Sequence, residues 1–229
     1  MDFILNEDQK MLRDTVRRIA EEKFAPIAAE IDEKEIFPTA SVKVLAENGL
    51  LGVQIPETYG GAGAGMLSMV LVVEEIARVC CSTSVILTTQ ALASDPLLLA
   101  GTEEQKKNFL YRLASGECLG ACGITEPGAG SDVSGMKTTA KKVDGGYVLD
   151  GAKIFITNGG EAEIVTVLAY TDREKGNRGI SMFILDKGMQ GFTVGKKEHK
   201  MGLHGSDTRE LVFENVFVPA DRLLGPEGS

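Results

Sequence analysis

The chain has 229 residues and a formal net charge of −9, and 43% of its residues are hydrophobic. This length accommodates one large domain or two small ones, and the hydrophobic fraction is sufficient for a packed core. The negative charge argues against nonspecific binding to nucleic acid or anionic membranes. An anionic ligand would therefore need local basic groups such as Lys137, Lys141, Lys142 or Arg178.

The four cysteines do not form a disulfide framework. Two of them are adjacent within a helical pattern, and Cys118 and Cys122 share one face if their segment is extended. A zinc site would need two further ligands close to a pair of thiols, and none is evident. Buried free thiols in a reducing cytosol are the favoured interpretation, and no metal is expected.

The longest apolar runs, such as 69–73, are far shorter than the roughly 20 residues of a membrane span. A signal peptide is not expected, because Asp2 and residues 6–10 interrupt the start of the chain with polar side chains. The sequence favours a bacterial cytoplasmic protein. The alternative is the mature form of a mitochondrial matrix protein.

Residues 1–117 have the periodicity of an all-helical domain. Asn6 with Gln9, and Thr102 with Gln105, have the spacing of capping boxes at the starts of two helices.

Breaks and loops within this helical region follow from its prolines and glycines. The pattern predicts a break near Pro26 and a kink or break at Pro96. Residues 60–65 predict a flexible glycine-rich loop, because the lysine and hydroxyl residue of a phosphate-binding loop do not follow. Residues 66–79 are apolar on nearly all sides and predict a buried helix.

Residues 118–229 change to a strand pattern. The expected strands cover 137–143, 147–149, 153–157, 164–170, 180–185 and 211–218. Asp144-Gly145-Gly146 predicts a hairpin turn, and the strand spacing indicates an antiparallel barrel or sandwich. The predicted fold class is α+β, with a helical domain over 1–117 and a β domain over 118–229.

Two stretches have a composition suited to a ligand: GACGITEPGAGS at 120–131 and KIFITNGG at 153–160. In the first, proline and glycines form a sharp turn in which Ser131 and successive N–H groups can cradle an anion, most plausibly a phosphate. In the second, Phe155 offers an aromatic wall and Thr157 a hydroxyl. Together they suit a diphosphate attached to a heteroaromatic ring.

Both stretches resemble motifs of the acyl-CoA dehydrogenase family. TEPGAGSD at 125–132 is similar to the family's flavin-contacting TEPxAGSD motif, and FIT at 155–157 to its [WF]IT motif. A third similarity is Met201-Gly202, followed by GSDT at 205–208. The resemblance covers the whole chain and implies a non-covalent FAD cofactor.

The resemblance also implies site residues from both stretches. The implied cofactor-binding residues are Cys122, Ile124, Thr125, Gly130, Ser131, Phe155, Ile156 and Thr157. Thr157 would lie near flavin N5, Phe155 beside the isoalloxazine ring and Thr125 at its pyrimidine edge. Ser131 and Arg178 are the implied substrate-binding residues. The structural alternatives are a strand threonine, a core phenylalanine and a turn-capping serine beside Asp132.

The implied reaction is α,β-dehydrogenation of an acyl-CoA thioester, in which a carboxylate removes the α proton while the β hydride passes to the flavin. The resemblance gives Glu126 no proton-transfer role. It places the family's catalytic glutamate in a third, helical domain, which these 229 residues do not include. No catalytic base is therefore expected in this chain, and the isolated residues should be inactive.

The resemblance is to the short-chain, butyryl-CoA-like branch, which passes electrons to an electron-transferring flavoprotein. An apolar patch on the first helix and on the helix starting at Met66 is the expected docking surface for that acceptor. A homo-oligomer is expected, a tetramer in the full-length form. The alternatives are an acyl-CoA oxidase and a non-catalytic flavin- or CoA-binding module.

Overall fold

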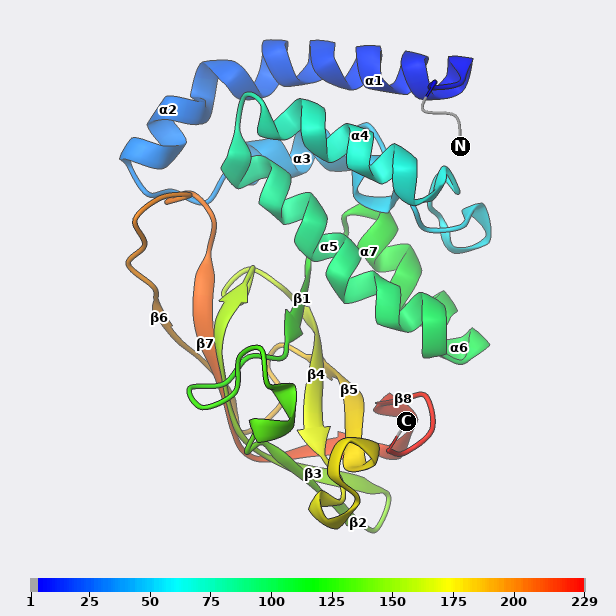
Figure 1. Ribbon diagram of the computed structural model, residues 1–229, viewed down its shortest axis with the longest axis vertical. Helices are drawn as coiled ribbons and strands as arrows, with labels where there is room; N and C mark the ends of the chain where they lie inside the picture. Colours follow the sequence, from blue (N-terminus) through cyan, green and yellow to red (C-terminus); the bar gives the residue numbers. More distant parts are fainter. Residues whose placement is uncertain (1–3, 229) are drawn as a thin grey trace. The chain divides into compact units, whose positions relative to one another are not determined.

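The computed structural model describes residues 4–228, so Asp2 lies outside the described residues. These residues divide into two compact units (Figure 1). The first contains the chain up to Ala91 together with Tyr111–Glu117 and His199–Ser206, and the second contains the remainder. Because the units alternate along the chain, the division into continuous domains over 1–117 and 118–229 stays a prediction.

Helices form most of the first unit. They are α1 (Glu7–Ile19), a π-helical turn (Ala20–Phe24), α2 (Ala25–Glu33), α3 (Thr39–Glu47), α4 (Gly65–Ala77), the start of α5 (Cys81–Ala100) and α7 (Tyr111–Ser115). Short 3₁₀ turns cover Leu50–Gly52 and Glu57–Tyr59, while α6 (Glu103–Gln105) and a π turn (Lys106–Leu110) belong to the second unit. Among residues 4–228, no helix is long and apolar enough to span a membrane.

The first helix begins with the predicted capping box and is fixed to α4 by an ion pair. Asn6 and Gln9 each bond the other's backbone N–H, as Thr102 and Gln105 do in the second unit. Arg17 of α1 donates to both carboxylate oxygens of Glu75 in α4, at 2.9 and 2.6 Å. The hydrogen bond from Arg17 holds the pKa of buried Glu75 below its ordinary value.

The structure also tests the expectations at the two prolines and at the apolar helix. A π-helical turn separates α1 from α2 next to Pro26, as expected, and Pro26 lies in the first turn of α2, where its missing N–H removes no helical bond. Pro96 lies inside α5 and does not end it, so no break occurs there and a kink stays a prediction. The start of α4 is not buried on all sides, because Met66 and Val70 are half exposed.

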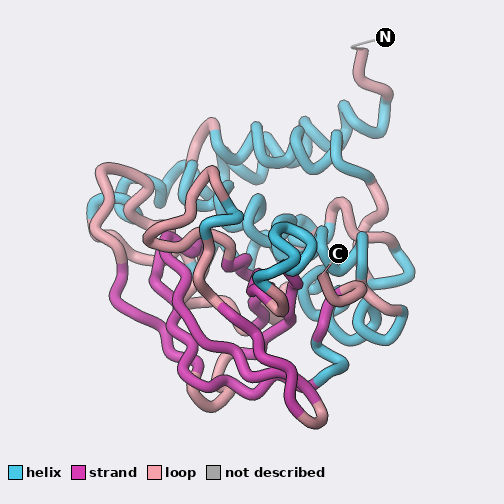
Figure 2. Tube along the Cα trace, turned by 60° about the horizontal axis from the view of Figure 1, so that its bottom comes forward, coloured by secondary structure: helices cyan, strands magenta, loops and turns pink. Residues whose placement is uncertain are grey.

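The second unit is built on an eight-stranded sheet. Its strands are β1 (Gly120–Gly123), β2 (Thr139–Val143), β3 (Gly146–Thr157), β4 (Ile164–Tyr170), β5 (Ile180–Asp186), β6 (Phe192–Lys197), β7 (Thr208–Pro219) and β8 (Leu223–Leu224). The order is β6-β7-β3-β2-β4-β5-β8, and β1 pairs with β4. Figure 2 shows the strands in magenta. The predicted hairpin is confirmed, because Val143 pairs with Gly146.

The expected antiparallel barrel or sandwich is wrong for this sheet. It is mixed, since β1 and β4 are parallel from Gly120↔Ile164 to Gly123↔Val167, and within the described residues its order does not close. Parallel neighbours require a long connection, and the chain from β1 to β4 provides one. All but one residue of β4 is buried, which explains why its sequence is almost wholly apolar.

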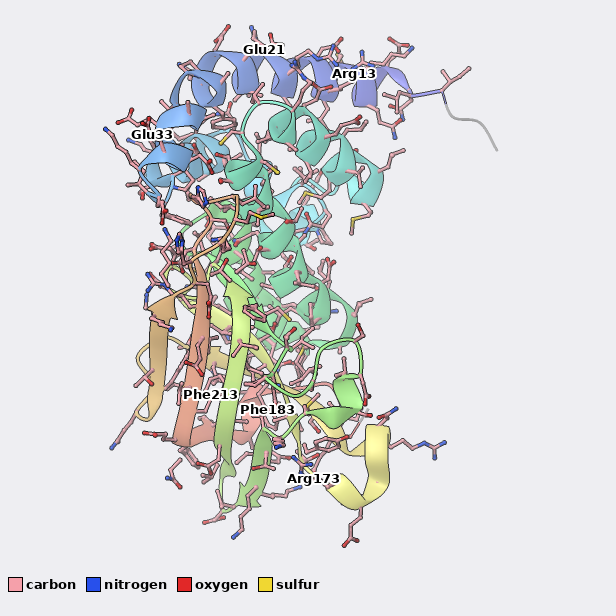
Figure 3. All side chains as sticks on the ribbon, turned by 60° about the vertical axis from the view of Figure 1, so that its left-hand side comes forward. Arg13, Glu21, Glu33, Arg173, Phe183 and Phe213 are labelled. Atoms are coloured by element: carbon pink, nitrogen blue, oxygen red, sulfur yellow. The ribbon has the colours of Figure 1, made fainter. Side chains whose placement is uncertain are left out.

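The core of the second unit consists of alternating side chains from these strands. Phe183 of β5 and Phe213 of β7, both labelled in Figure 3, are buried in it. The predicted strands at 147–149 and 153–157 are parts of one long strand, β3, whose pairing with β7 shifts twice. The first shift lies between Leu149 and Gly151, and the second between Lys153 and Ile156.

Gly151 has φ +145°, and a Cβ built there would lie 2.7 Å from Cα of Thr138. We predict that Gly151→Ala lowers the free energy of unfolding by more than about 2 kcal/mol, because backbone strain and a clash with main chain add together. Gly188, at φ +93° with nothing within 4 Å, is the matched control. Gly188→Ala should lose only the strain of about 1–2 kcal/mol. Urea denaturation of both variants measures the difference, and equal losses would contradict the clash.

Candidate functional site

The loop from β1 to β2 begins with a tight turn. Glu126 and Ala129 exchange backbone hydrogen bonds, each 3.0 Å long, around Pro127 and Gly128. Proline followed by glycine suits the two central positions of such a turn. A Cβ at Gly128 or at Gly130 would meet no atom within 4 Å, so the tip of the turn is open.

The base of this loop is held by a buried ion pair. Nζ of Lys153 lies 2.7 Å from Oε1 of Glu126 and donates to the carbonyl of Ile124 at 3.0 Å. The same carboxylate accepts the backbone N–H groups of Lys137 and, at 3.1 Å, Thr138. Lys153 is 0% exposed and Glu126 is 6% exposed. The pair therefore ties both ends of the loop to β3.

Burial alone would raise the pKa of the Glu126 carboxyl. The hydrogen bonds from Lys153, Thr138 and Lys137 outweigh this effect and hold its pKa below the ordinary value of 4.5. A carboxylate held in this way is an anchor and is not positioned to remove a proton from a substrate.

The second bulge of β3 turns Phe155 outward. Phe155 has φ +58° and is 60% exposed, whereas its neighbour Ile156 is buried in the core. A left-handed backbone is unfavourable for a bulky residue, and such strain is concentrated at functional sites. N–H of Ile154 donates to the carbonyl of Thr125 at 2.8 Å, which joins this strand to the loop.

The structure thus brings the two ligand-like stretches together within one unit. The hydroxyls of Thr125, Ser131 and Thr157 accept or donate no hydrogen bond within residues 4–228. Three hydroxyls and an exposed aromatic ring therefore remain available for a ligand. The turn-capping alternative for Ser131 is wrong, because Asp132 accepts from the N–H of Ser134 instead.

The other predicted residues take different positions. Ile156 offers only its backbone to a ligand, because its side chain is in the core. Cys122 in β1 is buried opposite Thr166 of β4, and burial raises the pKa of its thiol. The exposed Arg178 makes no hydrogen bond or ion pair within the described part of the chain, so its role stays a prediction.

The cysteines are free: three are buried as expected, but Cys81 is exposed. In the same range, 4–228, no three metal-ligating side chains gather into a possible metal site.

Two residues of the site were not anticipated. Lys153 forms the ion pair with Glu126, and Asp207 fixes the turn after Thr157 by accepting N–H of Gly160 at 2.6 Å. Asp207 also pairs with Arg209 at 2.7 Å, and its carbonyl accepts N–H of Asn158. One signal was present for the ion pair: each of the two stretches contains a single charged residue, and the two charges are opposite.

Two family models match the chain. The acyl-CoA dehydrogenase N-terminal domain matches residues 6–117, and the acyl-CoA dehydrogenase middle domain matches residues 121–216. The chain belongs to the acyl-CoA dehydrogenase family. The resemblance predicted from the loop and strand motifs is thereby confirmed.

Relatives and solved structures agree with this family. The short-chain specific acyl-CoA dehydrogenase of Clostridium acetobutylicum is 47% identical over 229 residues, which are 100% of this chain and 60% of that protein. The butyryl-CoA dehydrogenase structure from Megasphaera elsdenii has a TM-score of 0.95 at 46% identity, covering 100% of this chain and 61% of that one.

A third similar chain comes from a structure described as the electron-transferring flavoprotein of Acidaminococcus fermentans and concerned with flavin-based electron bifurcation. It has a TM-score of 0.97 at 46% identity, over 100% of this chain and 60% of that one. The 229 residues therefore span about 60% of the length of the acyl-CoA dehydrogenases that they match.

The lowered pKa of Glu126 predicts loss of stability in acid. The folded protein binds fewer protons at this carboxylate than the unfolded chain does, so its contribution is complete above the ordinary pKa and is lost as the pH falls through the lowered one. Urea midpoints measured from about pH 7 to about pH 3.5 should fall more steeply for the wild type than for Glu126→Gln. A difference between the two proteins that is the same at every pH would contradict this assignment.

Proposed function

We propose that the protein containing this chain is an FAD-dependent acyl-CoA dehydrogenase acting on short-chain acyl-CoA thioesters. The observation that carries the proposal is the junction of the loop at 124–131 with the bulged end of β3. An exposed ring and three hydroxyls that have no hydrogen-bond partner among residues 4–228 belong to these two segments. The proposal is also supported by the family to which the chain belongs, and by its similarity to proteins named as short-chain specific acyl-CoA dehydrogenase and butyryl-CoA dehydrogenase.

The residues present fit a flavin. The face of Phe155 is available for the isoalloxazine ring, and Thr157 and Thr125 offer hydroxyls to its polar atoms. The open turn with Gly130 and Ser131 suits a phosphate group, since no side chain fills the space beside Gly130. When bound, FAD supplies the acceptor for the β hydride of the thioester.

The residues of this chain would bind and orient the cofactor and the substrate. Thr157 would donate its hydroxyl near the ring nitrogen that gains the hydride, Phe155 would exclude water from the ring, and Ser131 would contact a phosphate or the CoA arm, with Arg178 as a further substrate contact. The carboxylate of Glu126 forms the buried ion pair with Lys153. We therefore place the general base in a part of the enzyme that these 229 residues do not include, and we expect them to be inactive alone.

The identity of the electron acceptor distinguishes the two candidate activities, a dehydrogenase and an oxidase. We propose an electron-transferring flavoprotein, in keeping with the structure from Acidaminococcus fermentans, and docking on the half-exposed Met66, Leu67 and Val70 of α4. The rival is an acyl-CoA oxidase. Rapid reoxidation of the substrate-reduced enzyme by air would favour the oxidase, and slow reoxidation favours the dehydrogenase. A bacterial cytoplasmic homotetramer is the proposed assembly and location.

Thr157→Val tests the hydroxyl. The substitution is nearly isosteric, so the fold should persist while flavin reduction by butyryl-CoA slows about three- to tenfold, the effect of one hydrogen bond of about 0.5–1.5 kcal/mol. Thr193 on β6 is an exposed strand threonine and provides the control Thr193→Val. Anaerobic stopped-flow absorbance measures both rates. Equal rates in the two variants would leave Thr157 with a structural role only.

The variant Phe155→Gly distinguishes the effect of Phe155 on backbone strain from its contact with the flavin. Glycine adopts φ > 0 freely, so relief of strain offsets the lost ring contacts and the free energy of unfolding should change by less than about 1 kcal/mol. The affinity for FAD should fall about tenfold, because the aromatic face is lost. The control is Phe217→Gly, which removes a half-exposed ring from β7 and should weaken the fold without changing FAD affinity. Unchanged FAD affinity in Phe155→Gly would exclude contact between its ring and the flavin.

A further inference from the structure

The loop from β1 to β2 has few interactions at its tip. Residues 127, 128, 130, 131 and 132 are exposed, and a Cβ at Gly128 or Gly130 would touch nothing. A loop of this kind samples several conformations unless its base is fixed. Its position therefore depends on the contacts of Glu126 and of residues 133–138.

Lys153 provides several of those contacts from β3, while Tyr170 and Arg173 donate to the carbonyls of Ser134 and Met136. The ammonium group of Lys153 donates to the carbonyl of Ile124 at 3.0 Å and to Glu126 at 2.7 Å, and it lies 4.0 Å from the sulfur of Met136. Through Glu126 it is also linked to the N–H groups of Lys137 and Thr138. One side chain thus reaches both ends of the loop.

Lys153 is two residues from Phe155 and four from Thr157, and the bulge of β3 begins at Lys153 itself. The bulge lets Lys153 remain buried while Phe155, which would otherwise lie on the same face, is exposed. The lysine therefore fixes the loop relative to the residues that present the ring and the hydroxyl.

An ion pair is not needed here for stability alone. Apolar side chains of similar volume in place of a buried ion pair are often neutral or stabilising, whereas a directional pair defines one geometry. A salt bridge that also orients the Ile124 carbonyl and two loop N–H groups is suited to setting position.

We propose that Lys153, acting through Glu126, is a positioning residue that preorganises the loop at 124–138 for the flavin. The inference rests on the proposed FAD-dependent function. It extends that function to two residues whose charged groups contact the loop and not the ligand. Preorganisation increases affinity because the loop does not have to be ordered on binding.

The test uses the purified enzyme in its FAD-free and FAD-bound forms. Lys153→Met should weaken FAD binding about 10- to 100-fold, the range found for residues that support the ligands of bound metals. Hydrogen exchange of residues 127–132 in the FAD-free form should accelerate in the same variant. Glu126→Gln, which keeps the size of the side chain, should show both effects if Lys153→Met does not fold.

Leu149→Ala is the matched control. Leu149 is a fully buried core residue of the same strand, so this change destabilises the unit without altering the loop contacts. It should leave FAD affinity and loop exchange unchanged. Equal losses of affinity in the Leu149 and Lys153 variants, or wild-type affinity and exchange in Lys153→Met, would overturn the inference while the proposed function stands. A wild-type enzyme that binds no FAD would overturn both.

Discussion

The contact between Lys153 and Glu126 is the constraint on which the site depends. Both charges are removed from water, and each satisfies the other at 2.7 Å. Neither charged group can leave the other and stay buried, because an isolated charge in this interior is strongly unfavourable. The loop and the end of β3 consequently hold one relative geometry, and departures from it separate the charges.

Around this contact, several usual features of a strand and of partly buried polar groups are absent. Phe155 has a left-handed backbone, β3 is bulged twice, and hydroxyls such as that of Thr157 have no partner within the described residues. By contrast, β4 pairs with β5 in unbroken register from Ile164↔Asp186 to Tyr170↔Ile180. A bulge, a left-handed phenylalanine and hydroxyls without a partner among the described residues occur together at this site, which indicates that it was shaped by a requirement other than stability.

Local chemistry explains what could be predicted from sequence. The capping box of Asn6 and the hairpin at Gly145 depend on neighbours in the chain, and both are present. The parallel pairing of β1 with β4 depends on residues far apart in sequence, so strand spacing alone pointed to the wrong sheet. The bulge at Phe155 was hidden for a different reason: no glycine or asparagine stands where the backbone becomes left-handed.

The site residues also fall into those that the sequence could locate and those that it could not. The motifs located Thr125, Phe155 and Thr157, which the structure places on adjoining segments. They did not distinguish the outward Phe155 from the inward Ile156, because the bulge interrupts the alternation that normally separates the two faces. Partners 27 residues apart, such as Glu126 and Lys153, come into contact only when the strands are assembled.

The helical unit contains one segment that is synthesised late. His199–Ser206 belongs to it: the N–H of His204 donates to Asp32 at 2.9 Å, and Gly205 lies against Ile31. During translation the first helices leave the ribosome more than a hundred residues before this segment does. Domains usually fold in the order of their synthesis. Here the amino-terminal unit cannot be completed until six of the eight strands have been synthesised, so the second unit begins to form before the first is complete.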